Sequence, residues 1–367
     1  MSNTISRKEF LIKAGSAIVG SSLISTLGFP SVILPRKKEK IGVALAGLGQ
    51  YSNGQLAPGL QGTEFCELRG IVTGTPSKIP KWQRLYNIPD KNVYSYDTMH
   101  ELADNDDIDV VYIVVPPGLH ATYGIRAADA GKHVWCEKPM DTTTKRCQAL
   151  IDACNKNKVQ LTIGYRMQHE PNTQTIMKYA RENPYGPITS VATGAGYNGW
   201  HSPDSWRTDP ELGGGALYDM GVYPINGARY ATGMEPVAVS GKMTSNRSVY
   251  DEVDETTKFT LEFPGGLIAE GETSFGKSTN YLEVDCENGW YELKPFQSYS
   301  GVKGKTSDGK KLPPAGGDQQ ARQMDNDARA ILENKKPIVP GEEGLRDIHI
   351  VEAIQESSKK GGVRVVL

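Results

Sequence analysis

The sequence predicts an α/β protein with two domains: a doubly wound parallel sheet at residues 36–164, and an α+β domain with an open, mainly antiparallel sheet at residues 165–367. The first observation is length, because 367 residues exceed one ordinary domain. The second is that short apolar runs alternate with helical patterns up to about residue 164, as in parallel strands joined by crossover helices. The third is that later segments alternate apolar and polar residues, which is typical of antiparallel strands.

The first domain is expected to follow the order strand, helix, strand throughout. Its strands are predicted at residues 41–46, 65–72, 109–115, 132–135 and 159–164, and its helices at 52–60, 77–86, 97–103, 119–130 and 142–157. The strand at 109–115 is almost wholly apolar and β-branched, so we expect it to be buried on both faces. Gly131 follows the helix at 119–130 and predicts its C-terminal cap.

The second domain is expected to begin with a helix at residues 172–182, which Asn183-Pro184 ends. Period-two patterns then predict strands at 188–197, 237–245, 255–263, 267–274, 280–286 and 290–293. Pro264-Gly265-Gly266 predicts a hairpin turn between two of them. The polar, glycine-rich stretch at 301–317 is expected to be a loop. Two late helices, at 318–333 and 344–360, are expected to pack back near the first domain.

Composition excludes several classes of protein. The net charge of −2 offers no basic surface for nucleic acid or for an anionic membrane. No two cysteines form a Cys-x-x-Cys pair, so zinc sites and thioredoxin-type chemistry have no support. The cysteines, which are expected to be buried free thiols, are Cys66, Cys136, Cys147, Cys154 and Cys286.

Residues 1–35 read as an export signal or anchor. Arg7-Lys8 precedes an apolar run at residues 14–29, which is too short to predict a spanning helix. Residues 6–11 resemble the twin-arginine pattern, with lysine in place of the second arginine, and that route carries folded proteins to the periplasm. No clear cleavage site follows, so an uncleaved anchor is an alternative, as is an ordinary N-terminal helix.

A glycine turn follows the first predicted strand. Gly47-Leu48-Gly49-Gln50-Tyr51 joins the strand at 41–46 to the helix at 52–60. Glycines at such a turn let backbone N–H groups approach a diphosphate at the helix N-terminus. Ser52 occupies the place of the third glycine of the usual fingerprint. The turn therefore predicts a dinucleotide-binding Rossmann domain.

The end of the second strand distinguishes NADP from NAD. An NAD enzyme usually has a carboxylate there to hold the ribose 2′-hydroxyl. Here the chain runs from Thr73 to Lys78 without Asp or Glu. Hydroxyls and an ammonium group suit a 2′-phosphate, so NADP is the predicted cofactor. A loop that accepts NAD as well is the alternative.

Two turns are expected at the carboxyl edge of the sheet, where ligands bind. Pro116-Pro117-Gly118-Leu119-His120 begins a helix, and His120 is expected either beside the cofactor without a proton-transfer role or only as a helix-start residue. In Glu137-Lys138-Pro139, the proline disfavours helix at Lys138, so the ammonium can point into the cleft. There it would help to deprotonate a sugar hydroxyl or lower the pKa of a neighbouring phenol, whereas the alternative is a solvated surface lysine.

Three consecutive glycines, Gly213-Gly214-Gly215, precede a predicted helix that carries Asp219 and Tyr223 on one face. A phenol has an ordinary pKa of about 10, so a tyrosine base needs a nearby cation, for which Lys138 is the candidate. A core aromatic is the alternative for Tyr223. Trp206-Arg207, just upstream, is expected to floor the pocket and bind phosphate or sugar hydroxyls, or else to pack the domains together.

These motifs resemble those of the glucose–fructose oxidoreductase/inositol dehydrogenase family, from about Lys40 to the C-terminus. The shared features are the glycine turn, the Pro-x-x-x-His turn, Glu-Lys-Pro, and three glycines followed by Asp-x-x-x-His or Tyr. The chain is most similar to the glucose–fructose oxidoreductase branch, which also carries tyrosine at position 223. Further similarity lies in Leu56-Ala57-Pro58-Gly59, Ile163-Gly164-Tyr165-Arg166 and Pro340-Gly341-Glu342-Glu343-Gly344.

The resemblance implies an exported oxidoreductase that holds NADP tightly, with Lys138, Asp219 and Tyr223 as the catalytic group. It also implies that Glu137 and Arg166 lie among the cofactor-binding residues, and that an open-faced sheet forms a homo-oligomer, as a dimer or tetramer. Gln50 stands where that branch carries lysine, which removes one cation near the phosphates. The predicted substrate loop at 198–209 also differs, so the sugar does not carry over.

The predicted function is therefore hydride transfer between NADP and a sugar, either an aldose or ketose or a related polyol. An NAD(P)-dependent glycosidase that oxidises its sugar only transiently is the alternative. A sugar sensor without catalytic activity is a more distant one.

Overall fold

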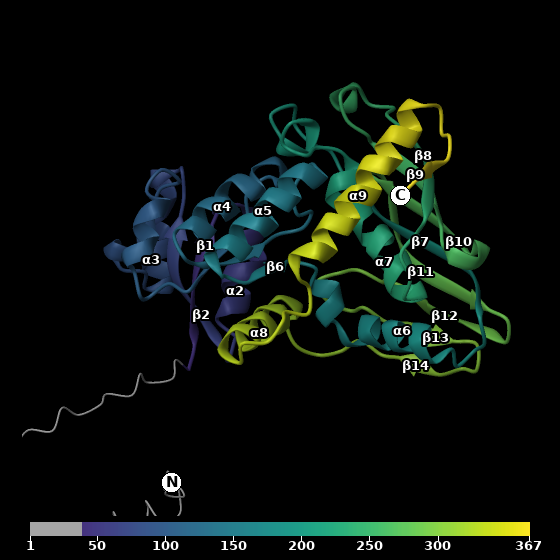
Figure 1. Ribbon diagram of the computed structural model, residues 1–367, viewed down its shortest axis with the longest axis horizontal. Coiled ribbons are helices and arrows are strands. Elements are labelled where there is room, and N and C mark those ends of the chain that lie inside the picture. Colours follow the sequence, from purple (N-terminus) through teal and green to yellow (C-terminus); the bar gives the residue numbers. More distant parts are fainter. Residues whose placement is uncertain (1–38) are drawn as a thin grey trace, which may run out of the picture. The chain divides into compact units, whose positions relative to one another are not determined.

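The computed structural model describes residues 39–367, so the expected export signal at residues 1–35 lies outside the described residues. Two sheets organise the described part of the chain (Figure 1). The first sheet has six strands and the second has nine. The predicted fold class, a Rossmann-type sheet followed by a domain with a mainly antiparallel sheet, is confirmed.

All neighbouring strands of the first sheet are parallel, in the order β3-β2-β1-β4-β5-β6. The strands are β1 (Ile41–Ala46), β2 (Cys66–Val72), β3 (Val93–Tyr94), β4 (Val110–Ile113), β5 (His133–Cys136) and β6 (Leu161–Ile163). This order is that of a dinucleotide-binding sheet. Every strand predicted from an apolar run is present. β3 was not predicted, because two residues are too few to form a pattern.

Helices cover both faces of this sheet (Figure 1). They are α2 (Ala57–Leu60), α3 (Ile79–Tyr86), α4 (His120–Asp129), α5 (Thr144–Asn157) and α8 (Gln319–Leu332). On one face, Val43 and Leu45 pack in the same core as Met324 of α8. On the other face, Ala44 and Ala46 pack in the core that contains α4 and α5. The sequence prediction that two late helices return to the first domain is therefore confirmed for α8, and the second late helix, α9 (Gly341–Lys359), also contacts α5 and β6.

The second sheet has the order β14-β13-β12-β11-β7-β10-β9-β8-β15. Its strands are β7 (Ile188–Asn198), β8 (Ala238–Thr244), β9 (Thr256–Glu262), β10 (Ile268–Ser274), β11 (Gly276–Cys286), β12 (Gly289–Leu293), β13 (Gly304–Thr306), β14 (Lys311–Leu312) and β15 (Val365–Val366). Only β7 and β10 pair in parallel, and the other neighbours are antiparallel. The sheet is thus mixed but mainly antiparallel, as predicted.

The prediction of a loop throughout residues 301–317 is wrong in part. β13 and β14 form a hairpin there, and β13 pairs with β12 at the edge of the sheet. Of these five strand residues, only Thr306 and Leu312 are buried. An edge hairpin with so few inward-facing side chains leaves no period-two pattern in the sequence.

α6 (Pro171–Glu182), α7 (Val222–Thr232) and α9 (Gly341–Lys359) complete the helices of the second domain. Every residue of α7 is buried, and the helix lies against β7 and β10. α9 crosses from β6 to β8 and contacts α7 (Figure 1). The helix at 52–60 starts as a π-helical turn at Ser52–Leu56, and the helix at 97–103 is a 3₁₀ helix at Met99–Asp104.

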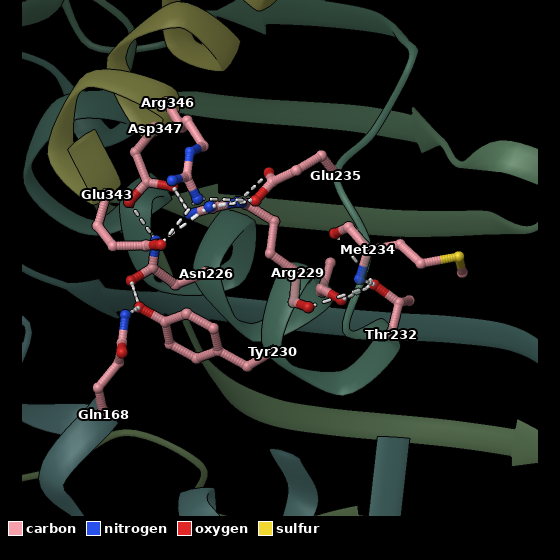
Figure 2. A network of polar contacts seen from close by, with 11 residues as sticks. Gln168, Asn226, Arg229, Tyr230, Thr232, Met234, Glu235, Glu343, Arg346 and Asp347 are labelled. Atoms are coloured by element: carbon pink, nitrogen blue, oxygen red, sulfur yellow. Dashed lines mark hydrogen bonds and ion pairs between the residues drawn. The ribbon is translucent and has the colours of Figure 1, made fainter. Parts of the chain in front are cut away.

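A buried guanidinium holds α7 to α9, as Figure 2 shows. Arg229 of α7 has a side chain that is only 3% exposed, and it forms ion pairs with Asp347 at 2.8 Å and Glu343 at 3.0 Å, both on α9. Glu235 forms a third pair with Arg229 at 2.7 Å. A buried charge that was left unpaired would be costly, so these carboxylates lock the position of α7. The first residues of that helix belong to the site described below.

All five cysteines lie among the described residues, where they are free thiols, and four of them are buried. Within residues 39–367, no three or more His, Cys, Asp or Glu side chains gather in a way that could hold a metal ion. No described helix combines the length and the apolar character that crossing a membrane would require.

Candidate active site

A cavity of about 660 Å³ opens beside the carboxyl edge of the first sheet and is lined from both domains. Its walls come from the glycine turn, the turn after β4, the segment after β5, the loop after β7, the turn before α7, the start of α7 and the segment after β12. The lining residues are Gly49, Gln50, Tyr51, Val114, Val115, Pro116, Pro117, His120, Glu137, Lys138, Trp200, His201, Ser202, Ser205, Trp206, Arg207, Asp219, Tyr223 and Tyr299. Most of the site residues predicted from the sequence therefore share one cavity.

The glycine turn has the shape that a diphosphate requires. Gly47 has a φ of +103°, and a Cβ there would lie 2.4 Å from the carbonyl oxygen of Val114, so only glycine fits. At Gly49, in contrast, no atom lies within 4 Å of the Cβ position, and this residue lines the cavity. The hydroxyl of Ser52 donates to the carbonyl of Gly47 and fastens the turn. The open space at Gly49 fits a phosphate group that approaches the backbone.

The loop after β2 brings a cation to the same turn. Lys78 Nζ donates to the carbonyl oxygen of Leu48 at 2.9 Å. The hydroxyl of Thr73 is buried and accepts from the N–H of Thr75 at 3.1 Å, a contact within its own loop. Of the two residues predicted here, Lys78 is the one that faces the glycine turn.

Glu137 and His120 hold the turns around Lys138. Tyr112 donates to Glu137 Oε1 at 2.7 Å, and burial raises the pKa of Glu137. The two ring nitrogens of His120 lie 2.8 Å from the carbonyl oxygens of Pro139 and Val115. Burial lowers the pKa of this histidine. Carbonyl oxygens only accept hydrogen bonds, so a neutral His120 donates to one of them, and its ring lies between the turn after β4 and the segment after β5.

Lys138, Asp219 and Tyr223 converge at one end of the cavity. Lys138 Nζ donates to the backbone carbonyl of Asp219 at 2.8 Å and lies 3.8 Å from its Oδ1. The same ammonium lies 4.7 Å from the centre of the Tyr223 ring. Burial alone would raise the pKa of Asp219, but Arg207 and Lys138 outweigh it and hold that pKa below its usual range. The acid is therefore a carboxylate between two cations.

The hydroxyl of Tyr223 faces a different cation from the one that the sequence suggested. Arg166 Nη2 lies 3.3 Å from it, whereas Lys138 lies over the ring. Arg166 itself is only 2% exposed and is not among the residues that line the cavity. Its other amino group donates to Gln319 at 2.6 Å and to the carbonyl of Ser298 at 2.9 Å. Arg166, which the sequence predicted to be a cofactor ligand, thus contacts the hydroxyl of Tyr223 but does not line the cavity.

Trp206 and Arg207 both line the cavity, and the guanidinium lies 4.4 Å from the centre of the indole ring. Arg207 Nε donates to Asp219 Oδ2 at 2.7 Å. Arg207 therefore binds the carboxylate of Asp219 in addition to lining the pocket. Of the two roles left open for this pair, the floor of the pocket is the one that the geometry favours.

The three glycines let the chain pass between tightly packed groups before α7. Gly213 has a φ of +81°, and a Cβ there would lie 2.8 Å from Pro117 of the turn after β4. Gly215 has a φ of +99°, and its Cβ would lie 2.2 Å from a carboxylate oxygen of Asp254. That carboxylate accepts from the N–H of Leu217 at 2.9 Å and from Thr257 at 2.7 Å. Asp254 thus anchors the π-helical turn Leu217–Gly221 that carries Asp219.

This anchor predicts a specific pH dependence of stability. Burial raises the pKa of Asp254 from 3.8 to about 6, so the folded protein binds its proton more tightly than the unfolded chain does. The resulting stabilisation is full below pH ~4 and is lost as the pH rises through about 6, by about 3 kcal/mol in total. Asp254→Asn removes this contribution. The free energy of unfolding of each protein is measured by urea denaturation. The value for the wild type minus the value for Asp254→Asn should fall by about 3 kcal/mol between pH ~4 and ~7.

Asp251→Asn is the matched control, because Asp251 is exposed and three residues away. Its stability should follow the wild type at every pH. Parallel pH profiles for wild type and Asp254→Asn would contradict the prediction.

Several cavity residues were not predicted from the sequence. Tyr299 reaches the cavity from the segment after β12, and Arg166 lies 4.9 Å from the centre of its ring. Trp200 and His201 come from the loop after β7, which was singled out only as a substrate loop. No local pattern marks Tyr299, because only the folded chain brings it to the glycine turn, where its ring lies 5.9 Å from that of Tyr51.

Comparison with protein families gives two matches along the chain. An oxidoreductase family model with an NAD-binding Rossmann fold matches residues 41–165, and a Gfo/Idh/MocA C-terminal domain model matches residues 173–292. Together they cover more than half of the chain.

Similar proteins include enzymes of sugar metabolism. The chain is 29% identical over 340 residues to D-xylose 1-dehydrogenase [NADP(+)] of Haloarcula marismortui, covering 86% of this chain and 90% of that protein. It is 24% identical over 352 residues to scyllo-inositol 2-dehydrogenase (NADP(+)) of Bacillus subtilis, covering 89% and 96%. Among solved structures, aldose-aldose oxidoreductase from Caulobacter crescentus, complexed with glycerol, is 37% identical with a TM-score of 0.85, covering 89% of this chain and 100% of that one.

Proposed function

The chain belongs to the Gfo/Idh/MocA family of oxidoreductases, and on that premise we propose that it transfers a hydride between NADP and a ring-form aldose or a related polyol. One observation carries the proposal: the glycine turn borders the same cavity in which Lys138, Asp219 and Tyr223 converge. A dinucleotide along the glycine turn would extend its reactive ring toward those three side chains. The bound nicotinamide supplies the hydride acceptor or donor.

The residues of the chain supply the proton chemistry. Acting in its phenolate form, Tyr223 would take the proton of the sugar hydroxyl as the C–H bond breaks, and Arg166 and Lys138 lie where their positive charges favour that anion. Asp219, fixed by Arg207 and Lys138, orients the sugar hydroxyls. In the reverse direction Tyr223 returns the proton to the oxygen of the carbonyl.

A sugar suits the lining of this cavity. Trp200 and Trp206 offer aromatic faces, while Ser202, Ser205 and Arg207 offer hydrogen-bond donors. Such a mixture matches a ring with one apolar face and many hydroxyls. The named activities of the xylose dehydrogenase and the aldose-aldose oxidoreductase support an aldose as the first substrate to test.

The experiment is a spectroscopic assay of the purified protein with NADP and a panel of aldoses and inositols. A sugar-dependent rise in reduced nicotinamide supports the proposal. If the cofactor co-purifies, alternate addition of two sugars should reduce and then reoxidise it, as in a ping-pong cycle. Hydrolysis of a nitrophenyl glycoside without net change in the nicotinamide would instead identify the glycosidase alternative.

Lys78→Glu should change cofactor preference. A carboxylate at this position would repel a 2′-phosphate and could accept a ribose 2′-hydroxyl, so NADP binding should weaken and NAD binding should not. We expect the ratio of the NAD and NADP dissociation constants to fall by about 10- to 100-fold. Fluorescence titration of the purified variant with each cofactor measures this ratio without requiring a substrate.

The control is Lys91→Glu, which makes the same change of net charge. Lys91 is exposed and pairs with Asp107 at the far end of the sheet. It should leave the ratio unchanged. If both variants change the ratio of the NAD and NADP dissociation constants equally, the change results from net charge and not from the position of Lys78.

We also propose that the protein is exported to the periplasm and acts as a homo-oligomer. Export is supported by the basic and apolar pattern of residues 1–35. Assembly is supported by the family resemblance, which implies contacts through the open face of the second sheet. Cell fractionation tests the first proposal, and light scattering of the purified protein tests the second.

A further inference from the structure

A chain of hydrogen bonds runs outward from Asp219 on the side away from Lys138. Tyr197 donates to Asp219 Oδ2 at 3.4 Å. His201 Nε2 lies 2.9 Å from the hydroxyl of Tyr197, and its Nδ1 lies 2.8 Å from the hydroxyl of Tyr250. Tyr197 lies near the end of β7 and His201 in the following loop, whereas Tyr250 lies between β8 and β9. The three side chains come from separate segments and form one hydrogen-bonded series, which ends at the carboxylate of Asp219.

One set of hydrogen-bond directions satisfies every group in this chain. Asp219 is a carboxylate and only accepts, so in this set the hydroxyl proton of Tyr197 points to it. The oxygen of Tyr197 must then accept from Nε2–H of His201. Nδ1 of His201 is left as an acceptor for the hydroxyl of Tyr250. All four groups are satisfied when His201 is neutral with its proton on Nε2.

The surroundings of His201 favour this neutral form. Its ring packs edge-on against Phe275, with 4.7 Å between ring centres, which fixes its orientation. Burial lowers the pKa of His201, and the cations Arg207 and Arg247 lower it further, against an opposing effect of Asp219. The facing titratable groups are thus Tyr197, Tyr250 and Asp219, with Arg207 and Arg247 as the facing cations.

We propose that Tyr197 and neutral His201 are positioning residues for the reaction, which hold the carboxylate of Asp219 toward Lys138 through one directed chain of hydrogen bonds. The inference rests on the proposed function for its kinetic consequences, although the chain itself does not. Arg207 fixes Oδ2 of Asp219 from one side and Tyr197 contacts the same oxygen, which leaves Oδ1 directed to Lys138. Displacements of a fraction of an ångström among the side chains of such a site lower the reaction rate substantially.

Protonation of His201 would disturb the chain. Both ring nitrogens would then donate, so the hydroxyl proton of Tyr250 would have to turn away from Nδ1 and would lose its acceptor. The side chain of Tyr250 is buried, and His201 is its hydrogen-bond partner among the described residues. The rate should therefore fall at acid pH, below the ordinary histidine pKa of about 6.5.

The first test needs no substrate. In protein labelled with ¹⁵N-histidine, the resonances that disappear in His201→Gln identify this ring. They should show the Nε2–H tautomer at neutral pH, and Tyr197→Phe should shift the midpoint of their titration. A charged ring at neutral pH, or a proton on Nδ1, overturns the proposal even if no sugar is turned over.

The second test is kinetic. Tyr197→Phe and His201→Phe should each lower kcat about 10-fold, with KM and the NADP dissociation constant within about 3-fold of wild type. His201→Gln keeps an amide donor near the place of Nε2, so it should recover most of kcat and lose the acid limb of the pH profile. Tyr185→Phe and His100→Gln are matched controls at remote exposed contacts. An unchanged kcat and pH profile in folded, NADP-binding variants would refute the proposal.

Discussion

Replacing Lys138 with methionine is expected to lower kcat for sugar oxidation by about 10³-fold, while NADP still binds. Methionine keeps the length and apolar stem of the side chain but removes the ammonium. That ammonium lies 2.8 Å from the carbonyl of Asp219 and 4.7 Å from the ring centre of Tyr223. Without it, a phenolate at Tyr223 loses one of the two cations beside it, and only Arg166 remains. Steady-state kinetics with NADP and the best aldose of the panel measure the loss.

The matched control is Lys145→Met, which makes the same chemical change on the exposed surface of α5. Its kcat should equal that of the wild type. Thermal melting and cofactor titration show whether Lys138→Met is folded and binds NADP. If a folded, NADP-binding variant keeps kcat within a few-fold, Lys138 is only a packing residue and the proposed proton chemistry fails.

The sequence was sufficient to predict this convergence because each residue sits at a position that the fold specifies. Lys138 follows a buried parallel strand at the carboxyl edge of the sheet, where ligands bind. Asp219 and Tyr223 lie one helical turn apart after three glycines. Apolar runs and period-two patterns likewise identified most strands, because burial leaves a direct trace in the sequence.

Other features depend on contacts that no local pattern records. The contact between Arg166 and the hydroxyl of Tyr223 joins residues 57 positions apart, and each of them is equally compatible with a core or a pocket. His201 reaches Asp219 only through Tyr197, and neither residue lies in a motif. The edge hairpin β13–β14 has too few buried side chains to show a period. Side-chain networks and short edge strands are thus the parts that required the folded structure.

A larger side chain at Gly49 is expected to abolish cofactor binding without unfolding the protein. The Cβ position of this residue has no atom within 4 Å and faces the cavity, so Gly49→Leu should fold with a stability within about 1 kcal/mol of wild type. The leucine side chain would then occupy the space that a diphosphate needs beside the backbone. The NADP dissociation constant should rise at least about 100-fold, which fluorescence titration or calorimetry measures.

Gly54→Leu is the matched control, because it adds the same side chain outside the cavity. Gly54 lies one turn later, also has no atom within 4 Å of its Cβ position, and is exposed outside the cavity. Both variants therefore add the same side chain to open space, and they differ only in whether that space belongs to the cavity. A folded Gly49→Leu that binds NADP as the wild type does would mean that no dinucleotide lies along this turn. The arrangement of Lys138, Asp219 and Tyr223 would then need another partner for its chemistry, whereas loss of binding in Gly49→Leu alone ties the cofactor to the turn that faces them.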